Sequence, residues 1–263
     1  GLSYGSLMHR RGYGSAVANM CRWAWEQELP LASAAGAWII GFASHAVLDR
    51  YTHPYINYFS GWVEPGDPHT ERYRSMHPFF ERLIDVALLK EMRRLHPNEL
   101  AFFSVVSCGP EPPPDWLSML EASLSSAYSR AEKDPELRAR LTSAYLDSMG
   151  YYEFTSVVDD VYLQEALARE ERGEIGTRWL SIVHPPNVPN DLDVLNMHEA
   201  AWCHPCNTRE SSTDSFPDRY ASALEESVEV AEVIAAAWSS NSEIAERMSV
   251  VETSVKNWNL SDG

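Results

Sequence analysis

The sequence predicts an all-α fold, and two observations support this prediction. Apolar residues recur at spacings of three and four along most of the chain, which is the period of an amphipathic helix. No segment alternates apolar and polar residues as a strand would, and no internal repeat is visible. With 44% hydrophobic residues, the 263-residue chain can also build a packed core. Helices are expected at residues 15–29, 31–59, 70–95, 115–130, 134–149, 151–172 and 217–239.

The first two expected helices differ in character. The first follows Gly14, takes Ser15 as its cap and ends before Pro30. The second begins with residues 31–48, which carry no formal charge and approach the shortest length of a membrane span. Charged residues follow this stretch directly, beginning with Asp49. This pattern favours a buried central helix over a transmembrane helix.

Loops rich in glycine, proline and acidic residues separate the later helices. They lie at residues 61–70 and 108–116. A longer irregular stretch, residues 184–217, exceeds the usual length of a connection in a compact domain, which indicates a functional or capping role. We expect one domain over residues 1–263, with residues 95–190 as a possible helical elaboration of a smaller core.

The charge of the chain limits its partners. It carries 21 basic and 38 acidic residues, a net charge of −17 with neutral histidines. Such a surface repels the phosphates of nucleic acids and anionic membranes. Nucleic acid is therefore not an expected partner, and a small-molecule substrate is favoured.

A first histidine and carboxylate motif lies on the expected central helix, at His45, Asp49 and His53. Residues four apart share a helix face, with a rise of about 1.5 Å per residue. His45 and Asp49 are thus close enough to chelate one ion, whereas His45 and His53 are about 12 Å apart along the axis. Paired metals in hydrolytic sites lie about 3.5–4 Å apart. The motif therefore suits two neighbouring ions, with His53 on the second and Asp49 able to bridge.

A second motif, at His77, Glu81 and Asp85, repeats the spacing of four. If its helix packs antiparallel against the first, His77 and Glu81 would face His53 and complete the second ion's ligands. Asp85 is better placed to accept a hydrogen bond from a ligand histidine. His9 is the candidate that completes the first ion's ligands. Nitrogen and carboxylate ligands with an open position are typical of catalytic zinc.

At these residues the chain resembles a known family. "GFASHAVLDRYTHPYINYFSG" followed by "HPFFERLID" is similar to bacterial zinc-dependent phospholipase C-like proteins, within the phospholipase C/P1 nuclease superfamily. Members show a histidine after a Gly-Ser turn, then HxxxDxxxHPY, then HxxxE with an aspartate one turn later. The resemblance covers residues 1–90 and, more weakly, 195–240. The residues of this chain that match the family's motifs are His9, His45, Asp49, His53, Pro54, Tyr55, His77, Glu81 and Asp85.

The resemblance implies an all-α fold with a zinc cluster in a cleft, and hydrolysis of a phosphodiester or phospholipid by a metal-activated water. Asp49 is then the residue expected to matter most for catalysis. Family members also carry an upstream Gly-Pro-Asp-like stretch and often a ligand for a third zinc. Neither stands in this sequence, so two zinc ions are expected. The alternatives are a P1-like nuclease and a non-catalytic helical binding module stabilised by zinc.

The sequence "CHPC" was weighed as a separate zinc site. Cys203 and Cys206 have the spacing of a ligand pair, and His198 lies nearby. The second pair that usually completes such a site is missing. A structural loop is the favoured interpretation. His69, His96 and His184 stand in loop-like contexts beside prolines or in their vicinity and are expected to be solvated.

Overall fold

The computed structural model describes residues 3–100, 102–155, 164–165, 168–169, 172, 185 and 187–261. The chain divides into two compact units, and each is described by itself. Unit 1 comprises Gly1–His53, Cys108–Leu146 and Asp218–Gly263. Unit 2 comprises Pro54–Ser107 and Asp147–Pro217.

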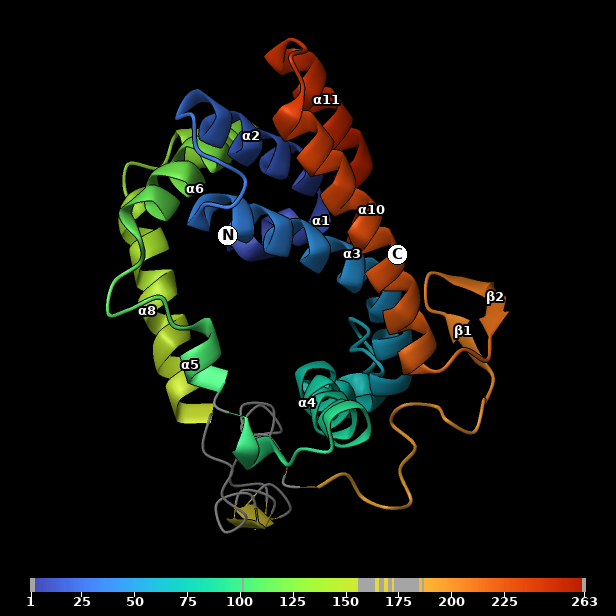
Figure 1. Ribbon diagram of the computed structural model, residues 1–263. Coiled ribbons are helices and arrows are strands. Elements are labelled where there is room, and N and C mark those ends of the chain that lie inside the picture. Colours follow the sequence, from blue (N-terminus) through green and yellow to red (C-terminus); the bar gives the residue numbers. More distant parts are fainter. Residues whose placement is uncertain are drawn as a thin grey trace. The chain divides into compact units, whose positions relative to one another are not determined.

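Unit 1 is built from helices that come from three separate stretches of chain (Figure 1). Helix α2 packs against both α6 and α11, and α3 is joined to α10 through Arg50 and Glu226. The helices α3, α8 and α10 each continue into unit 2. Their bounds are α1 Tyr4–Arg10, α2 Tyr13–Glu26, α3 Ala34–Ser60, α6 Pro114–Ala127, α7 Ser129–Glu132, α8 Leu137–Thr155, α10 Phe216–Ser239 and α11 Ile244–Val255.

The core of unit 1 lies among α2, α3, α10 and α11. Tyr13, Val17, Ile39 and Ile234 are fully buried there. The approach of α2 to α11 depends on Gly14, because a Cβ at this position would lie 2.7 Å from the carbonyl oxygens of both Glu252 and Lys256. The backbone N–H of Gly14 also donates to the Lys256 carbonyl at 2.9 Å. These contacts hold the first turn of α2 against the end of α11.

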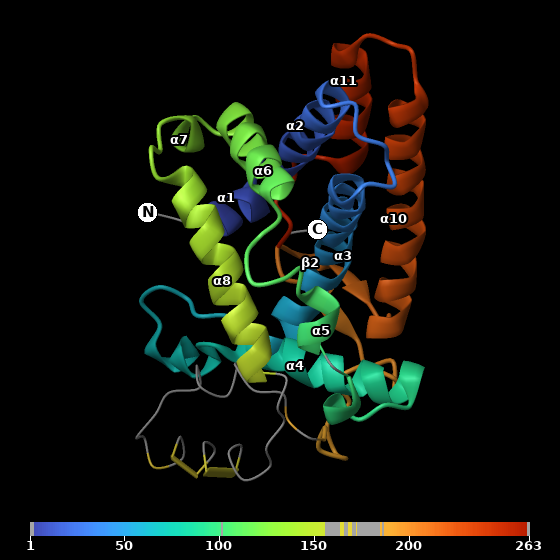
Figure 2. The ribbon, with the colours of Figure 1, turned by 60° about the vertical axis from the view of Figure 1, so that its left-hand side comes forward.

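Unit 2 combines short helices, among them α4 and α5 (Figure 2), with a hairpin of two strands (Figure 1). Its core surrounds Tyr55, whose hydroxyl donates to the Val194 carbonyl at 2.8 Å and whose ring contacts Trp202 and Phe216. The strands pair antiparallel, with a register shift between Cys203 and His204. The elements are the 3-10 helices η1 Pro68–Tyr73 and η3 Pro97–Glu99, the π-helix η2 Leu89–Arg93, the α-helices α4 Met76–Leu88 and α5 Phe102–Val106, and the strands β1 Trp202–His204 and β2 Asn207–Ser212.

The structure confirms the mainly helical fold but corrects several elements. The helix expected over 70–95 is three elements: η1, α4 and η2. Ser75 has a left-handed backbone (φ 65) and separates η1 from α4. The π-helix η2 follows α4 directly. The cap of α2 is Gly12 (φ 74), whereas the N–H of Ser15 donates to Asn257 Oδ1 at 2.9 Å. The hairpin was not expected. A helix expected over 151–172 lies largely outside the described residues.

The central helix α3 runs through Pro54, which has no N–H to donate to the preceding turn. The division between the two units falls at this same residue. Within the described part of the chain, none of the helices has the length and apolar character needed to cross a membrane.

Candidate metal centre

Helix α1 places His9 through two local contacts and one contact that is distant in sequence. Ser3 caps this helix by accepting a hydrogen bond from the Ser6 N–H at 3.1 Å. The buried Leu260 donates its N–H to the His9 carbonyl at 2.8 Å, which ties the end of α1 to the C-terminal part of unit 1. His9 Nδ1 lies 2.8 Å from the Gly5 carbonyl. An N–H at Nδ1 leaves Nε2 as the nitrogen that can bind a cation.

Three donor atoms meet beside α3. His9 Nε2 and His45 Nε2 are 3.3 Å apart. Asp49 Oδ2 lies 3.2 Å from the first of these nitrogens and 3.3 Å from the second. All three residues belong to unit 1. The helical spacing of four brings His45 and Asp49 together, and α1 supplies His9 from outside that helix.

This triangle has dimensions that suit the ligand atoms of one small metal ion such as zinc. Zinc binds nitrogen and oxygen at about 2.0–2.2 Å in tetrahedral geometry, which places its ligand atoms about 3.3–3.5 Å apart. The separations of 3.2 and 3.3 Å agree with that spacing. Three protein ligands leave the fourth position open, as in catalytic zinc sites.

The buried carboxylate gives independent support for a cation. Asp49 is 7% exposed, and within the described structure its Oδ2 makes no hydrogen bond of acceptable geometry. A buried carboxylate oxygen without hydrogen bonds is costly unless a cation or protonation compensates for it. The chemistry of the donor set therefore fits a metal ion held by His9, His45 and Asp49.

His53 lies on the other side of the Asp49 carboxylate. Its Nε2 is 3.8 Å from Asp49 Oδ1, whereas the two other histidines approach Oδ2. His53 is also buried. The two carboxylate oxygens of Asp49 thus face different histidines, which is the arrangement that a bridging carboxylate requires.

In unit 2, His77 and Glu81 form the second expected pair. His77 Nε2 lies 3.1 Å from Glu81 Oε1, and its Nδ1 lies 3.0 Å from Asn57 Oδ1. Asn57 holds the ring as Gly5 holds that of His9. Asn57 was not predicted as a site residue, although it continues the spacing of four that runs through the first motif. Asp85 lies one turn beyond Glu81 and pairs with Arg82 at 3.5 Å.

His45 lies on the central helix that the sequence predicts to be buried, but His45 itself is not buried. Its side chain is 44% exposed. It opens onto a pocket of about 330 Å³ between α3 and α10, and this pocket reaches solvent. Leu48, Tyr220 and Leu224 give the pocket an apolar wall, with Gly41, Ser44, Ala223 and Ser227 completing it.

Tyr13 closes the inner side of the site. Its ring stacks on Phe42 at 4.5 Å and lies 6.3 Å from the His45 ring. Burial, with the nearby charge of Asp49, raises the pKa of Tyr13 far above its usual range. The phenol therefore stays neutral and donates to the Phe42 carbonyl at 2.9 Å.

None of the remaining histidines and cysteines that the structure describes joins a group of candidate metal ligands. His198 pairs with Asp193 at 2.8 Å, and the Cys206 N–H donates to His204 Nδ1 at 3.1 Å in the hairpin. Over the described residues, neither Cys203 nor Cys206 joins a group with metal-ligand spacing. His69 is exposed, as expected, and His184 lies outside the described residues.

Comparison of the chain with protein-family models, with curated proteins and with solved structures found no match. The function is therefore argued from the site itself.

Proposed function

We propose that this protein is a zinc-dependent phosphodiester hydrolase of the phospholipase C-like type. The observation that carries the proposal is the triangle of His9 Nε2, His45 Nε2 and Asp49 Oδ2, with sides of 3.2 and 3.3 Å. Its dimensions suit a tetrahedral cation with one open position. Open positions of this kind are used in hydrolysis.

The residues of the chain have separable roles in this proposal. His9 and His45 bind through Nε2, and the Gly5 carbonyl keeps the His9 ring in the required orientation. The Asp49 carboxylate offsets the charge of the cation in a buried position. Bound zinc would supply Lewis-acid stabilisation of charge on a phosphoryl group and would lower the pKa of water.

A second zinc ion is part of the proposal. Its ligands would be His53, His77 and Glu81, as the sequence predicts, with Asp49 as the bridge. Two observations within the separate units support this assignment. Asp49 Oδ1 faces His53 in unit 1, and His77 is held beside Glu81 in unit 2.

The surroundings of His45 support a substrate with an apolar portion. The adjoining pocket presents Leu48, Tyr220 and Leu224 next to a candidate ligand. A phospholipid-like diester offers an apolar group next to its phosphate. A nucleic acid has bases but no alkyl chain, and it is repelled by the net charge of −17. The phospholipase C-like function is therefore favoured over a P1-like nuclease.

The non-catalytic alternative, a helical binding module stabilised by zinc, rests on the same donor triangle. A binding module of this kind would bind zinc as the enzyme does but would not hydrolyse a substrate. A substrate that needs no specificity pocket therefore separates the two.

The test uses bis(p-nitrophenyl) phosphate, which reports hydrolysis without lipid recognition. Zinc-loaded protein should hydrolyse it, a chelator should abolish the activity, and added zinc should restore it. His9→Ala should lose at least about a hundredfold in rate, while the matched control His69→Ala keeps full activity. Zinc bound at about two ions per chain without any turnover would exclude the enzyme and leave the binding module.

Specificity is tested on the same preparation. A short-chain phosphatidylcholine and a single-stranded oligonucleotide are offered separately, and release of phosphocholine or of nucleotides is followed. The proposal expects the lipid to be the better substrate. Preferential cleavage of the oligonucleotide would assign the nuclease function instead.

A further inference from the structure

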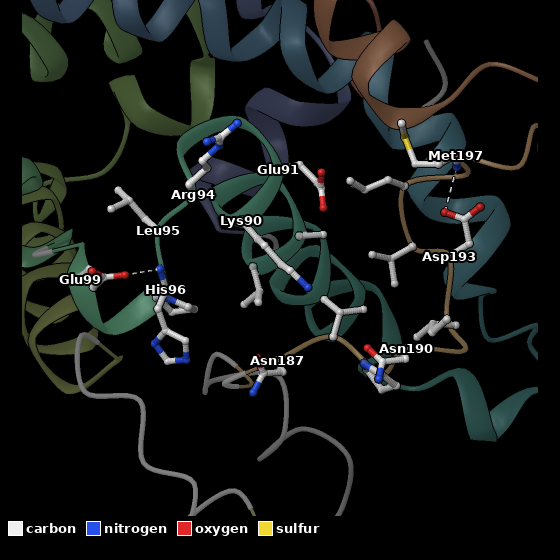
Figure 3. A pocket seen from close by; sticks show the side chains of 18 residues that line it. Lys90, Glu91, Arg94, Leu95, His96, Glu99, Asn187, Asn190, Asp193 and Met197 are labelled. Carbon is white, nitrogen blue, oxygen red and sulfur yellow. Dashed lines mark hydrogen bonds between the residues drawn. The ribbon is translucent and has the colours of Figure 1, made fainter.

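A second pocket, unrelated to the candidate metal ligands, lies within unit 2 (Figure 3). Its volume is about 640 Å³, inside the range of small-molecule sites. One wall comes from the end of α4 and the π-helix η2, and the other from residues 187–197. No role in the proposed hydrolysis accounts for this pocket.

The backbone of the first wall departs from regular helix. Residues Leu89–Arg93 form a π-helix that continues directly from α4. It ends at Arg94, whose φ of 54 is unfavourable for a residue other than glycine. Single π-helical turns are rare and recur at functional sites, as do strained residues. The distortion falls on the turn that carries Lys90.

Several polar side chains of this pocket carry hydrogen-bond donors that have no partner within the described part of the protein. Figure 3 shows Lys90 reaching across the pocket, with Asn187 and Asn190 on the side to which its ammonium points. Over the described part of the chain, the structure pairs none of these three side chains with a hydrogen-bond or ion-pair partner. The ammonium of Lys90 and the amides of Asn187 and Asn190 thus line one pocket, and all three residues are exposed to solvent.

The acidic groups of the lining are largely engaged elsewhere. Asp193 accepts from the N–H groups of Met197 and His198 and from His198 Nδ1, each at 2.8 Å. Glu99 accepts from the His96 N–H at 2.7 Å. Glu91 is exposed on the other side of the pocket from the two asparagines (Figure 3). Asp193 and Glu99 therefore would not compete with a bound anion for the ammonium of Lys90.

Apart from Arg94 and His96, the rest of the lining is apolar. Val86, Val194 and Leu195 are buried in the walls. Leu192 and Met197 also line the pocket, although they are 45% and 60% exposed. Large side chains left exposed together at a hollow mark a surface that gains from being covered by apolar groups.

We propose that this pocket binds an anionic amphiphile, with its anionic group at Lys90, Asn187 and Asn190 and its alkyl part against Leu192 and the apolar wall. The polar and apolar parts of the pocket correspond to the polar and apolar parts of such a ligand. Side chains with donors, Arg94 among them, line part of the pocket, and apolar side chains form most of the remainder. A medium-chain carboxylate has this division of polarity and fits the volume.

The experiment measures octanoate binding by isothermal titration calorimetry. One saturable site is expected, and Lys90→Gln should weaken it about tenfold through loss of a charge-assisted hydrogen bond. Lys133→Gln is the matched control, because Lys133 is an exposed lysine in unit 1. Asn190→Ala provides a second variant in the anion subsite. Circular dichroism and melting curves check that each variant is folded.

The apolar part is tested separately. Leu192→Ser should weaken octanoate binding, whereas Leu146→Ser, at 46% exposure in unit 1, should not. Hexanoate should bind more weakly than octanoate, by about fourfold for each methylene that is fully buried. Octylammonium and 1-octanol should bind poorly, because they lack the anion.

A carboxylate can also bind a metal, so the titration is repeated on Asp49→Asn protein after chelation. Octanoate binding at the unit 2 pocket should persist there. Equal binding by wild type and Lys90→Gln, equal binding of octanol and octanoate, or loss of binding in the chelated Asp49→Asn protein would each overturn the proposal.

Discussion

Asp49 contacts more of the candidate ligands than any other residue of the candidate centre does. Its Oδ2 faces His9 and His45, and its Oδ1 faces His53. A carboxylate with such neighbours either binds cations or pays for burial without hydrogen bonds. The orientation of the neighbouring rings favours the first case, since His9 Nδ1 is already engaged by the Gly5 carbonyl.

Part of this arrangement could be predicted from sequence, and part could not. The spacing of four alone predicts that His45, Asp49 and His53 share a face of one helix. The approach of His9 depends on Leu260, more than two hundred residues away, and leaves no local pattern. The Gly5 carbonyl is a backbone group, so its role as an acceptor cannot be predicted from the residue type.

His45→Ala should lower zinc content by about one ion per chain, whereas His69→Ala should leave it unchanged. His45 supplies one of three donor atoms, and His69 is exposed on η1. Because bound metal stabilises the folded state, His45→Ala should also melt earlier than His69→Ala when zinc is present. Elemental analysis and thermal melts on both variants provide the measurement. Equal losses in the two proteins would remove His45 from the ligand set.

Among the elements, α2 and α11 show how tightly the unit containing the centre is packed. Gly14 permits their approach, since a Cβ there would overlap two backbone carbonyls of α11 and the residue after it. No periodicity in the sequence distinguishes this glycine from Gly41, which has open space around its Cβ position. Only the tertiary contact separates them.

Gly14→Ala should reduce the free energy of unfolding by about 2–3 kcal/mol, because backbone must move to admit the methyl group. Gly41→Ala, on the open face of α3, should instead stabilise by about 0.5–1 kcal/mol through helix propensity. Denaturant unfolding of both variants measures the difference. Similar stability changes for the two would contradict the close packing of α2 and α11.

A buried charge network joins α3, α10 and the end of α11. Arg50 is 4% exposed and donates to Glu226 at 3.1 Å, while Lys256 and Tyr51 donate to the same carboxylate at 2.8 and 2.9 Å. Burial raises the pKa of Glu226, but the hydrogen bonds from Lys256 and Tyr51 and the charges of Lys256 and Arg50 outweigh it. The pKa of Glu226 is therefore lowered.

A lowered pKa means that ionised Glu226 stabilises the fold above its ordinary pKa, and that this contribution is lost as the pH falls through its value in the folded protein. Glu226→Gln should cost about 1–2 kcal/mol at pH 7, a figure reduced for partial solvent screening. The deficit should shrink as the pH falls below the ordinary pKa of a glutamate and through the lowered pKa of Glu226. Glu225→Gln, an exposed neighbour, is the control. A deficit that persists at acid pH would show that charge is not its cause.

At the scale of the whole molecule, the helical character was predictable because it rests on local periodicity. The division into two units was not, because unit 1 assembles three stretches of chain. The β1–β2 hairpin was missed since β2, Asn207–Ser212, has an exposed polar sequence without an apolar face. The expectation of one domain related to phospholipase C stays a prediction.

The central proposal is that the chain holds a zinc centre that depends on Asp49. The most direct test is zinc stoichiometry, with far-UV circular dichroism on the same samples, for wild type and Asp49→Asn. The variant keeps the size of the side chain but removes the charge that offsets neighbouring cations. Wild type should hold about two ions per chain, and Asp49→Asn should lose at least one while its helical spectrum is unchanged. Full zinc occupancy in Asp49→Asn, or under about half an ion in the wild type, would contradict the account.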